Sequence, residues 1–200
     1  MRKIVIIISA LSALVAVVFV FTRNNSDVNY QNSILDHRDK INDFMKGSDE
    51  SPFANQDIEY PGLSYYAPDR KYSIEADYLP IGNRRPLLLA TSDGKEETFE
   101  KYGYATFELQ GKSNKLLLLR SLEPSSDYLF MPFLDQTSGT ETYGGGRYLN
   151  VTLTDQEHIL LDFNKAYNPY CAYNENYSCP LPPKDNRLNI SIKAGEKDFD

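Results

Sequence analysis

The stretch TFEKYGYATFELQGKSNKLLLLRSL, residues 98–122, decides the fold class. Residues 98–102 and 104–109 are rich in the aromatic and β-branched side chains that favour strands, and a leucine run follows at 115–122. Residues 110–114 lie between them and contain the glycine and asparagine of a turn. A strand, a short turn and a second strand predict antiparallel neighbours, because parallel strands need a long crossover connection.

The same pattern continues on both sides of this stretch. Polar and apolar residues alternate over 72–79, and the apolar run at 86–91 precedes an Asp-Gly turn. The complete set of predicted strands is 72–79, 86–91, 98–102, 104–109, 115–122, 128–133, 147–153, 159–163 and 188–193. About nine short strands separated by turns predict a mainly β fold, an antiparallel barrel or sandwich.

A helix is expected before the strands, at residues 34–47. Its predicted inner face consists of Ile34, His37, Arg38, Ile41, Phe44 and Met45. Gly47 is expected to end it, and the apolar face to pack on the sheet. The polar residues 25–33 are interpreted as a linker, so that 34–200 form a single β-rich domain.

The N-terminus reads as a membrane anchor, residues 1–24. Residues 4–21 carry no charge, and 18 helical residues rise about 27 Å, close to the roughly 30 Å of a bilayer core. The segment ends in bulky residues, at 17–23, without a small-residue cleavage site, which favours an uncleaved transmembrane helix over a cleaved signal. Arg2 and Lys3 are expected to remain in the cytoplasm, which puts the domain outside it, in the periplasm or at the cell surface.

Charge and cysteine content restrict the partners. The net charge is −7 and the isoelectric point is about 4.9, which argues against nucleic acid. Cys171 and Cys179 are the only cysteines, and in an exported domain such a pair predicts a disulfide. The two histidines, His37 and His158, have no ligand-like spacing to them, so no metal or cofactor is predicted.

Two long irregular loops, residues 130–148 and 161–188, are rich in Gly, Pro, Asn and Tyr. Long structured loops in compact domains are usually functional. Arg147 follows three glycines, and it either grips an anion or pairs with Asp135 or Asp162 at a tight turn. The Tyr and Asn residues of the second loop form either a groove for sugars or peptides or a self-packed loop. The candidate ligand-binding residues are Asp135, Tyr143, Arg147, Asp162, Asn164, Tyr167, Asn168, Tyr173 and Asn186.

Several motifs in these loops carry a family resemblance. They are residues 135–139, 142–148, 162–173 and 179–183 with Asn186, joined by the shorter 51–53, 62–65 and 194–197. Together they resemble the domain of unknown function 1684 family over about residues 36–197. The resemblance implies a set of bacterial proteins, some of them exported or lipid-anchored, and no known activity. This chain differs from the lipid-anchored members, because it has no early cysteine to accept a lipid.

Two functional classes remain. The first is a non-catalytic binding or envelope-interaction module whose partner is an envelope protein, a peptide or a glycan. The alternative is a hydrolase-like enzyme that acts on a small polar or glycan ligand through Asp135, Arg147 and Asp162. The first class is favoured, because the sequence contains no recognisable catalytic constellation such as a G-x-S-x-G elbow.

Overall fold

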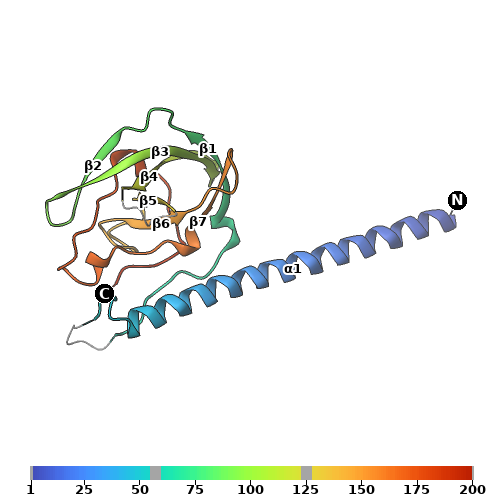
Figure 1. The fold of residues 1–200 in the computed structure, drawn as a ribbon. Coiled ribbons are helices and arrows are strands. Elements are labelled where there is room, and N and C mark those ends of the chain that lie inside the picture. The colour runs from blue at the N-terminus through green and yellow to red at the C-terminus, as the bar shows by residue number, and fades with distance from the viewer. Residues whose placement is uncertain (1, 55–59, 123–127, 200) are drawn as a thin grey trace.

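The computed structural model describes residues 2–54, 60–122 and 128–199, with side chains from residue 25 onward. It is mainly β, as predicted: a curled antiparallel sheet forms a half-barrel, and a long N-terminal helix runs past one side of it (Figure 1). The strands are β1 (Ser73–Pro80), β2 (Pro86–Ala90), β3 (Glu96–Leu109), β4 (Lys112–Ser121), β5 (Leu129–Phe133), β6 (Arg147–Val151) and β7 (His158–Asp162). Their order in the sheet is β6-β5-β4-β3-β1-β7, with β2 also paired to β3.

The described part of the chain has seven strands instead of about nine. The predicted strands 98–102 and 104–109 are one long strand, β3, whose register shifts between Lys101 and Gly103. Such a β-bulge bends a strand without ending it. Gly103 is suited to this position, because the ring of Tyr78 on β1 occupies the space that a side chain there would need.

The strand predicted at residues 188–193 is wrong. The alternation on which it rests is real, since Leu188, Ile190 and Ile192 are all buried. The backbone, however, does not join a regular β-ladder. The amide of Ile192 donates to the carboxylate of Asp135, and its carbonyl accepts from Arg147 at 2.9 Å. Leu188 and Ile190 do bond the backbone of Leu134 and Gln136, at 2.8 and 3.0 Å, but at Ile192 side chains replace the neighbouring strand.

The leucine run of β4 is buried on both faces of the sheet. Leu116 and Leu118 face the inside of the half-barrel, whereas Leu117 and Leu119 face a second apolar cluster outside it. This follows from the period of two along a strand, which sends successive side chains to opposite faces. The outer cluster lies beneath the second of the predicted loops, so this loop acts as a cover for the sheet.

The N-terminal helix, α1 (Arg2–Gly47), is continuous. It ends at Gly47, as predicted, but residues 25–33, expected to be a linker, are helical. No glycine or proline interrupts the sequence from Arg2 to Lys46, so nothing in it breaks the helix. Of the predicted inner face, Ile34, Arg38 and Met45 are buried.

The predicted membrane anchor, residues 4–21, lies outside the residues whose side chains are described. Among those that are described, from residue 25 onward, no helix has both the length and the apolar character needed to cross a membrane.

A buried arginine joins the C-terminal segment to the sheet. Arg147 of β6 is only 1% exposed. Its Nη1 donates to the carbonyls of Ala194 and Glu196, the latter at 3.0 Å, and its Nη2 lies 3.6 Å from Asp135. A guanidinium has five fixed donors and is well suited to such a multiple role. Arg147 therefore holds residues 192–196 against β6 in place of a β-ladder.

We expect Arg147→Met to lower the free energy of unfolding by about 3–5 kcal/mol, because it leaves Asp135 buried without its counter-charge and three carbonyls without a donor. Urea unfolding followed by circular dichroism measures this. Arg187→Met is the matched control, since Arg187 is exposed and should cost less than about 0.5 kcal/mol. Equal losses in the two variants would contradict the role given to Arg147.

Candidate functional site

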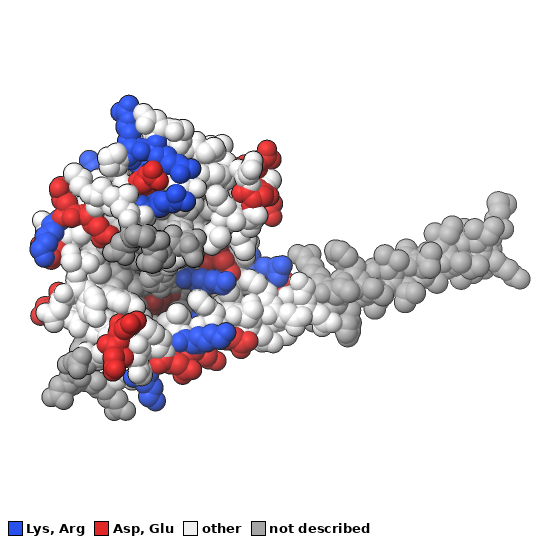
Figure 2. Space-filling view, in the orientation of Figure 1, with Lys and Arg blue, Asp and Glu red and all other residues white. Residues whose placement is uncertain are grey.

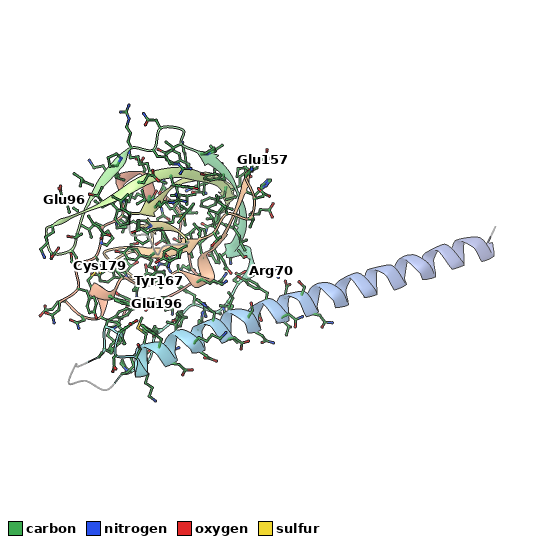
Figure 3. The ribbon with its side chains drawn as sticks, viewed as in Figure 1. Arg70, Glu96, Glu157, Tyr167, Cys179 and Glu196 are labelled. Atoms are coloured by element: carbon green, nitrogen blue, oxygen red, sulfur yellow. The ribbon has the colours of Figure 1, made fainter. Side chains whose placement is uncertain are left out.

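A cleft of about 740 Å³ opens between the outer face of the sheet, the 165–180 loop and the C-terminal part of α1. We name it the tyrosine cleft. Figure 3 places Tyr167, Cys179 and Glu196, which line it, on the side of the β-domain that faces α1. The aromatic residues of its walls are Phe44, Tyr65, Phe99, Tyr128, Phe130, Tyr148, Tyr167, Tyr170 and Tyr177. Its volume lies within the roughly 300–1,000 Å³ of small-molecule sites.

The sheet wall of the cleft is a chain of touching rings. Phe130 of β5 stacks on Phe99 of β3 with centroids 5.4 Å apart, and it meets Tyr148 of β6 edge-on at 4.7 Å. Tyr148 in turn meets Tyr167 at 5.8 Å. These residues share the outer face because they alternate with core-facing neighbours along their strands. Offset and edge-on contacts of this kind hold aromatic walls in a fixed shape.

The loop wall is positioned by its own turns. Tyr170 begins a short 3₁₀ helix, η3 (Tyr170–Ala172), and meets Tyr177 edge-on at 5.3 Å. Pro169 precedes it and fixes the chain direction where the helix starts. The hydroxyl of Tyr167 donates to Asn150 of β6 at 3.1 Å, which ties the loop to the sheet.

One end of the cleft is basic. His37 and Arg38 come from α1, and Lys165 comes from η2 (Phe163–Lys165). Arg38 is buried, donates to the carbonyl of Tyr66 at 2.8 Å, and stacks on the ring of Tyr65 at 4.5 Å. Burial, followed by the charge of Lys165, lowers the pKa of His37. Figure 2 shows this side of the molecule, where Lys and Arg side chains border the hollow between the β-domain and α1.

A buried carboxyl lies at the floor of the cleft. Glu196 is 1% exposed and accepts hydrogen bonds from the hydroxyl of Tyr173 and from both nitrogens of Asn168, at 3.0 and 3.1 Å. Burial raises the pKa of Glu196 to about 7, although these donors oppose the rise. Its acceptor sites are occupied by protein groups, which makes Glu196 a structural acid at the base of the loop.

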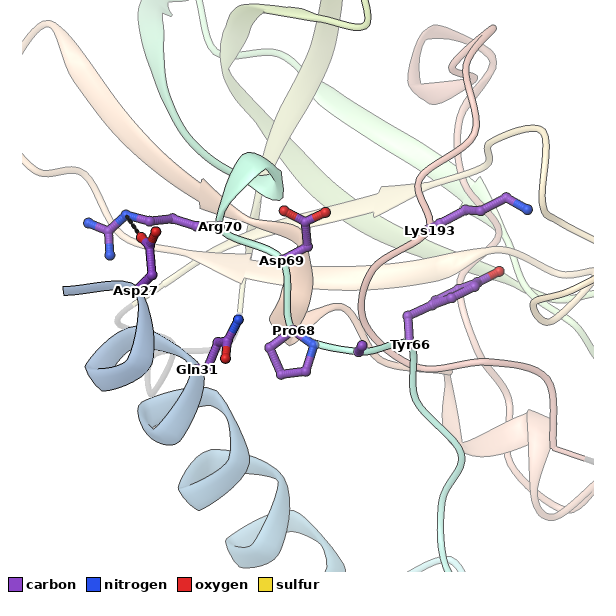
Figure 4. Close-up of a pocket in the computed structure, with 8 residues that line it drawn as sticks. Asp27, Gln31, Tyr66, Pro68, Asp69, Arg70 and Lys193 are labelled. Atoms are coloured by element: carbon purple, nitrogen blue, oxygen red, sulfur yellow. Dashed lines mark ion pairs between the residues drawn. The ribbon is translucent and has the colours of Figure 1, made fainter. Parts of the chain in front are cut away.

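A second depression, of about 440 Å³, lies between α1 and residues 66–70 (Figure 4). Its charged groups are exposed and pair with one another or with close neighbours. Arg70 lies 3.9 Å from Asp27, and Lys193 lies 2.8 Å from Glu141. Because these charges are already neutralised in solvent, the tyrosine cleft is the better candidate site.

The charged residues predicted as a site have internal roles. Asp135 and Arg147 form the buried pair described above. Asp162 and Asn164 instead hold α1 against the sheet: the hydroxyl of Tyr30 donates to Asp162 at 2.8 Å and accepts from the Asn164 amide at 2.8 Å. Asn164 also bonds the backbone of Asp69 in both directions, at 2.9 Å each way. The predicted residues therefore fall into two separate clusters, which stabilise different junctions of the fold.

Of the remaining predicted residues, some stabilise the fold and one, Tyr167, lines the tyrosine cleft. Asn186 accepts from the amide of Leu117 at 2.6 Å and donates to the carbonyl of Pro132 at 2.8 Å, so it bridges β4 and β5. Asn168 and Tyr173 hold Glu196, and the Tyr143 hydroxyl lies 3.8 Å from the sulfur of Cys171. Of all nine residues, Asn164 and Tyr167 line the tyrosine cleft.

The predicted disulfide is not formed in the structure: Cys171 and Cys179 are free thiols. They are nevertheless adjacent, since the amide of Cys171 donates to Sγ of Cys179 at 3.1 Å. A hydrogen bond from the Cys179 side chain lowers the pKa of Cys171 to about 6, and the same contact raises the pKa of Cys179. Among the described residues, no three His, Cys, Asp or Glu side chains are grouped to hold a metal ion.

The family follows from comparison with known proteins. The model of a family described as a protein of unknown function, DUF1684, matches residues 58–197. The chain belongs to the DUF1684 family. The resemblance read from the loop motifs is thereby confirmed, although the family model begins at residue 58 instead of near residue 36. The α1 wall of the tyrosine cleft therefore precedes the matched region of this DUF1684 protein.

A solved structure is similar to this DUF1684 chain. It is the solution NMR structure of an uncharacterized protein of Haloarcula marismortui, with 34% sequence identity and a TM-score of 0.67. The match covers 87% of this chain and 97% of that chain. None of the curated proteins compared with the chain matches it.

Some residues of the cleft were missed in the sequence. Tyr65, Phe99 and Tyr148 line it, yet each reads as an ordinary strand or loop aromatic. The sequence does give an indication for the two helix residues of the cleft, because His37 and Arg38 interrupt an otherwise apolar helix face. A polar pair on the inner face of a helix is a usable sign that this face borders a polar or hollow space.

In the reduced DUF1684 chain, Cys171 should react with iodoacetamide as a thiolate with a midpoint near pH 6. Cys179→Ala removes the hydrogen bond and should raise the midpoint toward the usual value, so that the rate at pH 7 falls roughly tenfold. Cys179→Ser keeps a donor and is the matched control. Mass spectrometry of the labelled peptide measures the rates, and an unchanged midpoint in Cys179→Ala would refute this account.

Proposed function

We propose that this protein is a membrane-anchored binding module outside the cytoplasm, which holds a small ligand in the tyrosine cleft without transforming it. The observation that carries the proposal is the cleft itself. It combines a preformed aromatic surface with a few polar groups at its edges, the composition that is typical of ligand sites. A peptide side chain or part of a glycan are occupants compatible with rings that carry hydroxyl groups.

The hydrolase-like alternative ranks second. It requires Asp135, Arg147 and Asp162 to act on a substrate. Arg147 and Asp135 are buried and bonded to backbone groups and to each other, and Asp162 is bonded to Tyr30. Catalytic acids and bases need access to the reacting atoms, and these groups are committed to protein partners.

The proposed location rests on the uncharged residues 4–21 and the basic residues before them. A helix of this length and composition is suited to span a bilayer with its basic end in the cytoplasm. Outside the cytoplasm, Cys171 and Cys179 would form a disulfide. The two thiols would lose two protons and give two electrons to a disulfide-containing oxidant, which is reduced to thiols.

The location is tested on the full chain in its own membranes. We expect it to stay in the membrane pellet after alkaline carbonate washing, and its cysteines to take up iodoacetamide only after reduction. Fractionation by immunoblot and intact mass measure the two properties. Leu14→Arg with Val17→Arg is the control, because two charges in the apolar segment should release the chain. Release of the unchanged chain by carbonate, or two thiols that react with iodoacetamide without reduction, would contradict the proposed location.

Binding in the tyrosine cleft is tested with naphthalene methanol, a neutral two-ring probe, on the full chain in detergent micelles. The probe should shift the NMR signals of His37 in the cleft and leave those of His158, which lies beside Asp155, unmoved. Tyr170→Ala should weaken binding roughly two- to tenfold through loss of a ring contact. Tyr66→Ala, outside the cleft, is the matched control. A probe that leaves His37 unmoved would exclude the cleft as its site.

A further inference from the structure

The basic end of the tyrosine cleft lacks a counter-charge. Within the described residues, no carboxylate lies within 4 Å of His37, Arg38 or Lys165. Arg38 is 6% exposed, and its Nε has no hydrogen-bond partner among those residues. Buried guanidinium groups are usually paired with an acid, because an isolated buried charge is costly. This end of the cleft therefore carries excess positive charge.

Other acids near the cleft do not neutralise this end. Asp162 acts on Arg38 at longer range, but its carboxylate is engaged by Tyr30 and Asn164. Glu196 is occupied by protein donors. Glu97 lies toward the opposite end, where its charge acts on Cys179. The cleft is thus basic near α1 and η2, and aromatic along the rest of its walls.

We propose that the ligand of the tyrosine cleft is a small aromatic acid. Its ring system lies against the tyrosine and phenylalanine walls, and its acidic group lies at Arg38, His37 and Lys165. Arg38 supplies a buried guanidinium with no carboxylate within 4 Å, and Lys165 supplies an exposed ammonium group without an ion pair in the described part of the chain. Charge-assisted hydrogen bonds to an anion are stronger than neutral ones, which favours an acid over a neutral ring compound. This inference rests on the proposed binding function.

His37 is a built-in reporter for the inference. The chain has two histidines, so their ring signals are easily told apart, and only His37 lines the cleft. Burial and the charges of Lys165, Arg38 and Lys40 lower the pKa of His37, whereas Asp162 raises it. An anion bound beside His37 should raise its pKa, because it stabilises the protonated ring. A neutral ligand in the same place should not.

The test compares three probes on the full chain in detergent micelles. They are naphthoate, naphthalene methanol with the same rings and no charge, and decanoate with the same charge and no rings. Naphthoate should bind the most tightly, and it alone of the two ring compounds should raise the pKa of His37. His158 is the internal control, and it should titrate identically in all samples.

Variants at Lys165 separate charge from shape. Lys165→Ala should weaken the binding of naphthoate roughly two- to fivefold, which corresponds to the loss of one exposed ion pair. The binding of naphthalene methanol should not change. Lys165→Arg should restore naphthoate binding. Lys184→Ala is the matched control, because Lys184 is an exposed lysine outside the cleft. Both positions are exposed, so all three variants should retain the fold.

The outcomes are distinct. Equal binding of naphthoate and naphthalene methanol, with no effect of Lys165→Ala, would overturn the inference that the ligand carries an acidic group. The proposed binding function would then still stand. Tighter binding of decanoate than of naphthoate would overturn the inference that the ligand contains an aromatic ring. If naphthalene methanol also fails to reach His37, the proposed function fails with the inference.

Discussion

The fold depends on one buried guanidinium. Arg147 stands at the start of β6 and bonds three carbonyls of residues 192–196, while Asp135 balances its charge and bonds the amide of Ile192. The C-terminal segment is thereby held in place without a β-ladder. That segment includes Glu196, which in turn holds Asn168 and the base of the second loop. The loop wall of the tyrosine cleft therefore depends on a contact made on the other face of the sheet.

Most of the fold could be predicted because it follows from the alternation of side chains. The β3–β4 pair, the mainly β class and the helix end at Gly47 all come from local periodicity and turn residues. The segment 188–193 shows the limit of that reasoning. Its alternation predicts correctly which residues are buried, but periodicity says nothing about hydrogen-bond partners. Whether a backbone bonds to a strand or to the side chains of Arg147 and Asp135 depends on contacts distant in sequence.

The candidate site was harder to predict for the same reason. Sequence reasoning selected polar residues in irregular loops, and most of these turned out to replace missing backbone partners: Asn186 bridges two strands, and Asn164 joins a loop to a helix. Their density reflects the irregularity of the chain they stabilise. The cleft is lined instead by aromatic side chains from β3, β5, β6, several loops and α1. No local sequence pattern predicts that segments so far apart in the chain share one surface.

The unbroken course of α1 has a mechanical consequence. The same helix begins at Arg2 and contributes His37 and Arg38 to the wall of the tyrosine cleft. A hydrogen-bonded helix is stiff along its axis and under torsion, and this one contains no glycine or proline before Gly47 at which it would bend. The first turns and the residues at the mouth of the cleft therefore belong to one continuous helix without a hinge residue between them. The contacts of Tyr30 with Asp162 and Asn164 fix this helix to the β-domain just before it reaches the cleft.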